Sequence, residues 1–236
     1  MMRGAVEAIQ HNLGAWALLA SIVLTAQLAL IGADLAIKEY AGEEPQAGWY
    51  RVCVIGQDIV VAIACALGQT LAFTRMGRDL GRPTWKIDGD LEALQRFFSM
   101  WFIFNLAGVA GLRAINSLAS SATDSSVLTL LLFFLAFASM LTPVGAAVMF
   151  YGNAGKTEVN QALNTLADQL PRLMSFVTIS FVVTVSTLML AERLPLWARP
   201  LVSVIESFQQ CFVFAGTWLV CIYHRDTEPE DQDFDF

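Results

Sequence analysis

Residues 12–34 read NLGAWALLASIVLTAQLALIGAD, and between Glu7 and Asp34 no side chain carries a formal charge when His11 is neutral. A helix needs about 20 mainly apolar residues to cross the roughly 30 Å hydrocarbon core of a bilayer. This stretch therefore predicts a membrane-spanning helix. It is too long for the apolar part of a cleavable signal peptide, and no small-residue cleavage site closes it.

Five more apolar stretches follow along the chain. The second reads VCVIGQDIVVAIACALGQTLAFT, and the fourth contains Pro143, which we expect to kink its helix. The sequence therefore predicts an all-α integral membrane protein whose fold is a six-helix bundle. The predicted spans are 12–34, 52–74, 97–118, 127–151, 173–191 and 200–223, in one membrane domain of residues 1–225 that precedes an acidic tail, 226–236.

The composition also favours a membrane environment. Apolar residues make up 56% of the chain and charged residues only 15%, where soluble domains carry about 25% charged residues. The mean hydropathy is +0.56. So few charges cannot cover the surface of a soluble domain, so we expect the lipid bilayer to be a partner. The net charge of -7 argues against a nucleic-acid partner.

The orientation is predicted from the lysines and arginines of the loops, which concentrate on the cytoplasmic side of membrane proteins. Placing both termini in the cytoplasm puts nine basic residues inside and five outside. The excess comes from the loop between the second and third spans. The inside residues are Arg3, Arg75, Arg78, Arg82, Lys86, Arg96, Lys156, Arg172 and Arg225, and the outside residues are Lys38, Arg51, Arg113, Arg193 and Arg199.

A short amphipathic segment precedes the first, third and fifth spans. These segments occupy residues 6–16, 91–101 and 158–170, and the first two align without gaps. Short helices with one apolar face lie in the plane of the membrane interface. The pattern indicates three repeats of an interfacial helix followed by a membrane hairpin, with coincidence in a biased composition as the alternative.

This layout resembles that of bacterial six-helix inner-membrane proteins. The stretches that carry the resemblance are IQHNLGAWALL at residues 9–19 and TRMGRDLGRPTWK at residues 74–86. The resemblance is one of general layout, and it implies a bacterial inner-membrane location. It assigns no functional residue.

Three charged residues fall inside predicted spans. Asp58 lies 16 residues from Thr74, Arg113 lies 16 from Phe97, and Glu206 lies 17 from Tyr223. At about 1.5 Å per residue, all three lie about 24–26 Å from the predicted cytoplasmic edge. Since an isolated charge there is costly, we expect Arg113 to face Asp58, Glu206 or both. The group either joins helices or forms a binding or proton-handling site.

Uncharged polar residues recur beside these charges. They can hydrogen-bond neighbouring helices or line a narrow hydrated path. Asn105 lies near the middle of the third span. The others form stripes at helical spacing: Asp58, Cys65 and Gln69 on the second span, Ser180, Thr184 and Thr187 on the fifth, and Ser203, Glu206, Gln210 and Thr217 on the sixth.

The chain contains no motif that specifies a reaction, and we expect no cofactor and no metal. The leading hypothesis is a non-enzymatic scaffold, assembly factor or accessory subunit that contacts other membrane-protein subunits. The alternative is a small transporter or channel subunit that uses Asp58, Arg113 and Glu206. The acidic tail is either a solvated end or a peptide that binds a basic partner through Phe234 and Phe236.

Overall fold

The computed structural model of the chain describes residues 1–41, 47–81, 87, 89–119, 124–152 and 155–227. Within these ranges the regular structure is entirely helical. The α-helices are α1 (Met2–His11), α2 (Leu13–Ala41), α3 (Ala47–Leu80), α4 (Asp90–Ala119), α5 (Asp124–Tyr151), α6 (Lys156–Asp168), α7 (Leu170–Arg193) and α8 (Pro200–Thr227), and a short 3-10 helix, η1 (Leu196–Ala198), precedes α8.

Six of these helices, α2, α3, α4, α5, α7 and α8, are long and apolar enough to cross a membrane. The prediction of six apolar helices is therefore confirmed. The helices extend beyond the predicted ranges because polar residues at their ends continue the helix. The clearest case is α3, which runs from Ala47 to Leu80 and so continues six residues past Thr74.

Two of the three predicted surface segments overlap separate short helices, although residues 13–16 of the first belong to α2. The helix α1 ends where the Asn12 side chain donates a hydrogen bond to the Ala8 carbonyl, and α6 ends just before Pro171 in the first turn of α7. The segment 91–101 differs, because it forms the first turns of α4 without a break. No proline or glycine interrupts α4 between this segment and the apolar span.

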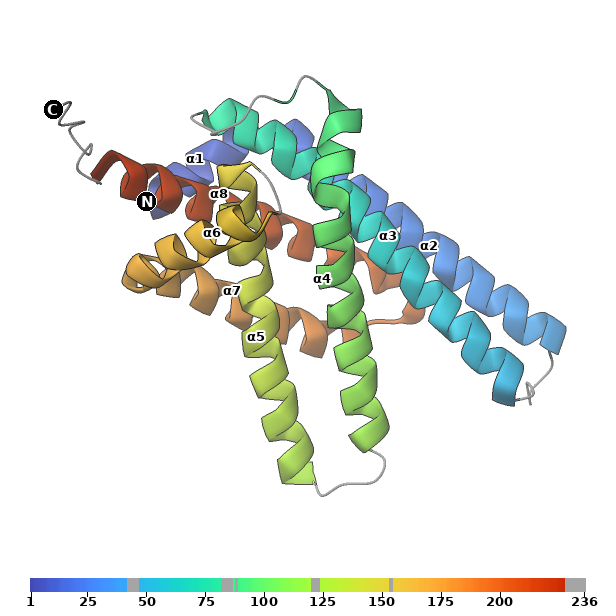
Figure 1. Cartoon of the computed structure of the whole chain (residues 1–236). Coiled ribbons are helices and arrows are strands. Elements are labelled where there is room, and N and C mark those ends of the chain that lie inside the picture. Colours follow the sequence, from blue (N-terminus) through green and yellow to red (C-terminus); the bar gives the residue numbers. More distant parts are fainter. Residues whose placement is uncertain (42–46, 82–86, 88, 120–123, 153–154, 228–236) are drawn as a thin grey trace, which may run out of the picture.

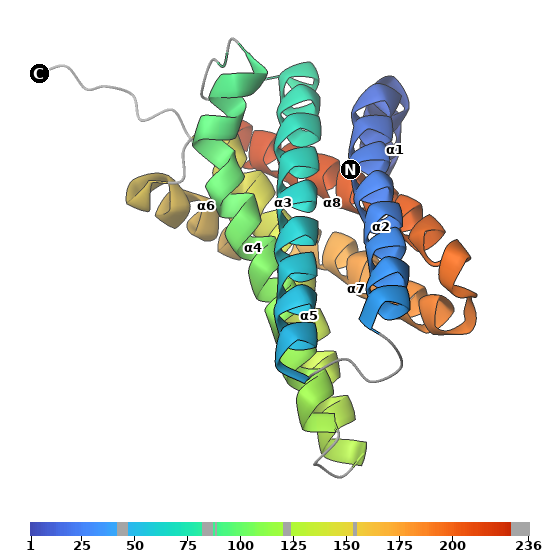
Figure 2. The same cartoon turned by 90° about the vertical axis from the view of Figure 1, so that its right-hand side faces the viewer.

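The long helices form three hairpins, α2–α3, α4–α5 and α7–α8. Figure 1 and Figure 2 show that the hairpin tips, at Ala41/Ala47, Ala119/Asp124 and Arg193/Pro200, point in three different directions. The opposite ends of the helices meet, and we call this region the core end. In the predicted bundle the helices would run side by side over their full length. In the structure the three hairpins diverge instead.

An aromatic cluster at the core end joins the hairpins. Phe73 of α3 stacks on Phe214 of α8 with ring centroids 4.3 Å apart. Trp218 of α8 packs edge-on against Phe150 of α5 and donates its indole N–H to the Gly81 carbonyl at 3.2 Å. Offset and edge-on ring contacts add to the stability gained from burial. The stretch of α8 from Phe214 to Trp218 therefore contacts both of the other hairpins, α2–α3 and α4–α5.

The helix α8 is the central element of the fold. It contacts α1, α2, α3, α5, α6 and α7. In its most apolar stretch 67% of the residues are buried, whereas the other five long helices bury between 17% and 28%. The hairpin walls away from the core end are therefore largely uncovered by the protein itself.

Small residues allow large rings to reach the helix backbones at the core end. Trp101 of α4 is fully buried and donates its indole N–H to the Met149 sulfur at 3.3 Å. Its ring lies directly over Gly145 of α5, where a Cβ atom would overlap it. Gly145 is therefore required for the close approach of α4 and α5.

We expect the substitution Gly145→Ala to lower the free energy of unfolding by about 1–3 kcal/mol, because the added methyl group must displace the buried Trp101 ring. The measurement is thermal unfolding of the purified chain in mild detergent. The matched control is Gly108→Ala on α4, where an added Cβ would meet nothing within 4 Å. Equal effects of the two substitutions would contradict this packing.

Candidate functional site

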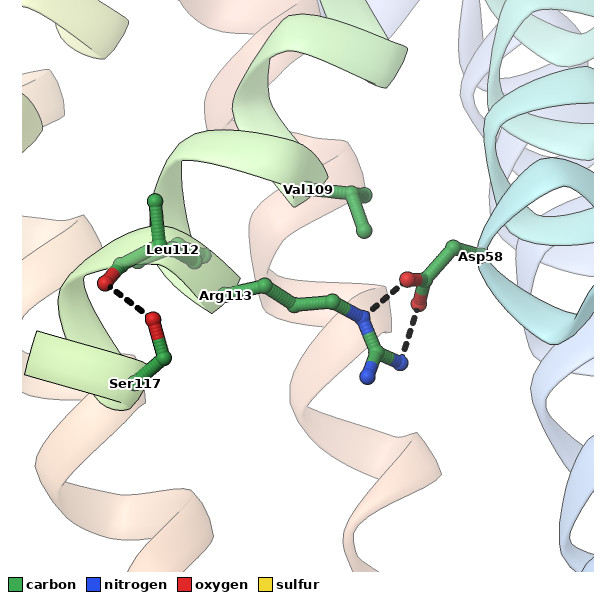
Figure 3. Close-up of a pocket in the computed structure, with 6 residues that line it drawn as sticks. Asp58, Val109, Leu112, Arg113 and Ser117 are labelled. Carbon is green, nitrogen blue, oxygen red and sulfur yellow. Dashed lines mark hydrogen bonds and ion pairs between the residues drawn. The ribbon is translucent and has the colours of Figure 1, made fainter. Parts of the chain in front are cut away.

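Asp58 of α3 and Arg113 of α4 form an ion pair. The Arg113 Nη2 atom donates to Asp58 Oδ1 at 2.7 Å, and Arg113 Nε contacts Asp58 Oδ2. Figure 3 shows this two-point contact, which is the strong geometry for an arginine and a carboxylate. The pair lies in an open hollow of about 630 Å³ whose other lining residues are Val109, Leu112, Ala114 and Ser117.

The pair is not sealed from its surroundings. The Arg113 side chain is 45% exposed and that of Asp58 is 18% exposed. Arg113 Nη2 also approaches the Val54 carbonyl at 3.4 Å. The arrangement therefore links α3 to α4 while leaving part of the guanidinium accessible from the hollow.

Glu206 lies at a different place. Its Oε1 atom accepts a hydrogen bond from the Thr187 hydroxyl of α7 at 3.1 Å, and no ion pair joins it to Arg113. It lines a cavity of about 200 Å³ between α5, α7 and α8. The structure thus divides the three charges into a pair and a separate carboxyl group. The other lining residues are Ala138, Ser139, Thr142, Ser180, Thr184, Gln209 and Gln210.

Three amide side chains form a hydrogen-bonded chain between α4, α3 and α8. Asn105 donates to the Trp101 carbonyl at 2.7 Å and to Gln69 Oε1 at 2.6 Å. Gln69 in turn donates to Gln210 Oε1 at 3.1 Å. The structure therefore brings together Asn105 and Gln210, which the sequence singled out. Gln69, which the sequence placed in a polar stripe, connects the two by hydrogen bonds.

The amide chain lines a second cavity of about 230 Å³. This cavity shares Ala138, Thr142, Thr184 and Gln210 with the cavity of Glu206. We call the two together the polar cavity. It lies between the three hairpins, beside the core end, because Trp101 and Phe104 form part of its lining.

Gln209 contributes to this region although the sequence stripes omit it. Its Nε2 atom donates to the Ser180 hydroxyl at 2.5 Å and to the Ser180 carbonyl at 3.3 Å, so it joins α8 to α7. Ser203 and Thr217, which belong to the stripe, instead donate to carbonyls of their own helix. The missed signal was the adjacent pair Gln209 and Gln210, whose side chains reach two different neighbouring helices.

The chemistry available to the polar cavity is hydrogen bonding and ion pairing. Asp58 pairs with Arg113 and Glu206 with a hydroxyl, so the two carboxyl groups do not form an acid–base pair. Within the described ranges, no three His, Cys, Asp or Glu residues are grouped to hold a metal ion. The cavity is therefore suited to binding a polar or charged group.

Comparison of the chain with protein-family models, with curated proteins and with solved structures finds no match.

The ion pair gives a testable energetic coupling. We expect Asp58→Asn and Arg113→Gln each to destabilise the chain in detergent, and the double variant to lose less than the sum of both. A coupling of about 1 kcal/mol is expected because the pair is part-exposed. The same cycle on the exposed pair Arg3 and Glu7 of α1 serves as control and should show no measurable coupling. Additive losses at Asp58 and Arg113 would contradict the pairing.

Proposed function

We propose that this chain is a polytopic membrane protein acting as a non-enzymatic scaffold, assembly factor or accessory subunit of a membrane complex. The observation that carries the proposal is the divergence of the three hairpins, which leaves their apolar walls uncovered around polar groups. Exposed residues such as Phe133, Phe137 and Val182 would face lipid or another protein.

Lipid alone accounts for only part of this surface. Hydrocarbon tails cover apolar side chains but cannot hydrogen-bond to the part-exposed Arg113 or to the polar cavity. Polar groups inside membrane proteins usually face other helices or water-filled cavities. A partner subunit between the hairpins would cover the apolar walls and hydrogen-bond to the polar groups. This complementarity supports a scaffold function.

The orientation we propose places the core end and both termini in the cytoplasm, with the chain in a bacterial inner membrane. The basic residues support it. Arg3, Arg75, Arg78, Arg96 and Arg172 belong to the helix ends that meet at the core end. Such an excess of arginine marks the cytoplasmic side of inner-membrane proteins.

The short helices α1 and α6 would lie at the membrane surface on that side. The helix α1 buries Ala5, Ala8 and Ile9 while exposing Arg3 and Glu7. Two-faced helices of this kind are suited to the interface. They would give the complex a cytoplasmic docking surface. The tail residues Phe234 and Phe236 lie outside the described residues.

The test is a pull-down from native membranes in mild detergent, with mass spectrometry, using the full chain and a chain ending at Thr227. We expect stoichiometric partner subunits with the full chain. Their loss from the shortened chain would assign the tail as a docking peptide, and their retention would assign the contact to the helices. A chain that purifies alone from detergent and from native nanodiscs would exclude the scaffold.

A small transporter or channel subunit is the second candidate. The observation that favours it is a carboxyl group, Glu206, inside a cavity that also contains amides and hydroxyls. If this candidate is correct, the purified chain in liposomes will carry protons or small cations. Glu206→Gln will then abolish the flux reported by an entrapped dye, while the exposed Glu192→Gln will preserve it. Absence of flux with the unaltered chain would exclude this candidate.

A further inference from the structure

Glu206 has no cationic partner among the residues that the structure describes. The Thr187 hydroxyl donates to its Oε1 atom at 3.1 Å. One turn further along α8, the Gln210 Oε1 atom accepts a hydrogen bond from Gln69. Arg113, the other candidate counter-ion, is paired with Asp58. A carboxyl group among apolar helices requires a proton or a cation to compensate its charge.

The amide of Gln209 carries a second acceptor beside the polar cavity. Because the Ser180 carbonyl can only accept, its contact with Gln209 Nε2 at 3.3 Å fixes which way the amide points. The Gln209 Oε1 atom therefore points away from Ser180 and receives no hydrogen bond from the described residues. Gln209 lines the same cavity as Glu206.

The amide chain supplies a third acceptor by the same reasoning. The Trp101 carbonyl fixes the orientation of Asn105, and Asn105 then fixes that of Gln69. The Asn105 Oδ1 atom is left without a donor among the described residues, and Asn105 lines the adjoining part of the cavity. Three oxygen acceptors from three side chains thus lack a strong donor, and one of them belongs to a carboxyl group. The same chain leaves the Gln210 Nε2 atom as a donor beside them.

We propose that the polar cavity receives a lysine or arginine side chain from a transmembrane helix of a partner subunit, with Glu206 as its counter-ion. The inference rests on the proposed function and specifies how the partner binds. An ammonium group carries three donors and a guanidinium five, and neither accepts hydrogen bonds. Such a group complements both the charge of Glu206 and the open acceptors of Gln209 and Asn105.

The cavity is large enough for a basic side chain. Its two parts measure about 200 and 230 Å³. The helices that form the cavity carry exposed apolar residues, among them Phe137 on α5, Val182 on α7 and Ile205 on α8. The apolar body of the partner helix would pack on these walls while its basic side chain enters the cavity.

The test uses synthetic helices of about 22 leucines and alanines, with one lysine six residues from the end, as Glu206 lies six residues from Pro200. Association with the full chain is measured in nanodiscs by energy transfer from a fluorescent protein fused after Phe236. We expect the lysine helix to bind at least ten-fold more tightly than the same helix with leucine. Glu206→Gln should remove this difference, and the exposed Glu192→Gln should preserve it.

A charge reversal separates direct pairing from a change in fold. A Glu206→Lys chain should bind a helix with glutamate at the same position and reject the lysine helix. All variants are first compared with the unaltered chain by thermal unfolding. If Glu206→Lys does not fold, the Gln variant and its Glu192→Gln control decide the result.

Equal binding of the lysine and leucine helices to the unaltered chain would overturn the inference. Glu206-dependent binding of butylammonium without binding of the lysine helix would also overturn it and assign the cavity to a small solute. Partners that still co-purify with Glu206→Gln from native membranes would support the proposed scaffold function and contradict a contact through Glu206. Without any co-purifying partner, the proposed function itself fails.

Discussion

The packing of Trp218, Phe214 and Phe73 holds the three hairpins together. Phe214 and Trp218 both come from α8, while Phe73 comes from α3 and the neighbouring Phe150 comes from α5. Gly77 allows the Trp218 indole to lie against the backbone of α3, and Gly145 allows the indole of Trp101, a neighbour of Phe73, to lie against the backbone of α5. Beyond this region α3 and α4, which belong to different hairpins, remain in contact, as the ion pair of Asp58 with Arg113 shows.

Some of this structure could be predicted from the sequence. Charge-free apolar stretches such as residues 12–34 are long enough to reveal each span, because transfer of apolar side chains out of water is a local property of the segment. The break at Asn12 and the start of α7 near Pro171 also have local causes. Divergence of the hairpins could not be predicted, because it depends on which rings meet glycines on distant helices.

The polar residues illustrate the same limit. A common distance from the span ends placed Asp58 and Arg113 at one level, and they lie in contact. The same argument placed Glu206 with them, but depth along a helix says nothing about position around the bundle. Glu206 instead meets Thr187 of α7. Gln69 appeared in the sequence only as part of a stripe, since its role in joining Asn105 to Gln210 requires the third dimension.

The ion pair and the polar cavity differ in whether their polar groups are paired within the chain. The ion pair of Asp58 and Arg113 neutralises itself and is complete within two adjacent helices. The polar cavity is built from all three hairpins and retains open acceptors beside a carboxyl group. A partner that fills it would contact each hairpin and hold them at one angle, so the proposed scaffold would itself be made rigid by what it binds.

The central place of α8 has a consequence for how the chain is made. Ribosomes synthesise helices in chain order, so α2 to α7 emerge before the helix that most of them pack against. Until Phe214 and Trp218 have been synthesised, Phe73 and Phe150 lack the rings that join them to α8. The first two hairpins can already pair through α3 and α4, where Phe73 meets Trp101. The polar cavity is therefore completed only at the end of synthesis, because α8 supplies Glu206, Gln209 and Gln210 to its lining.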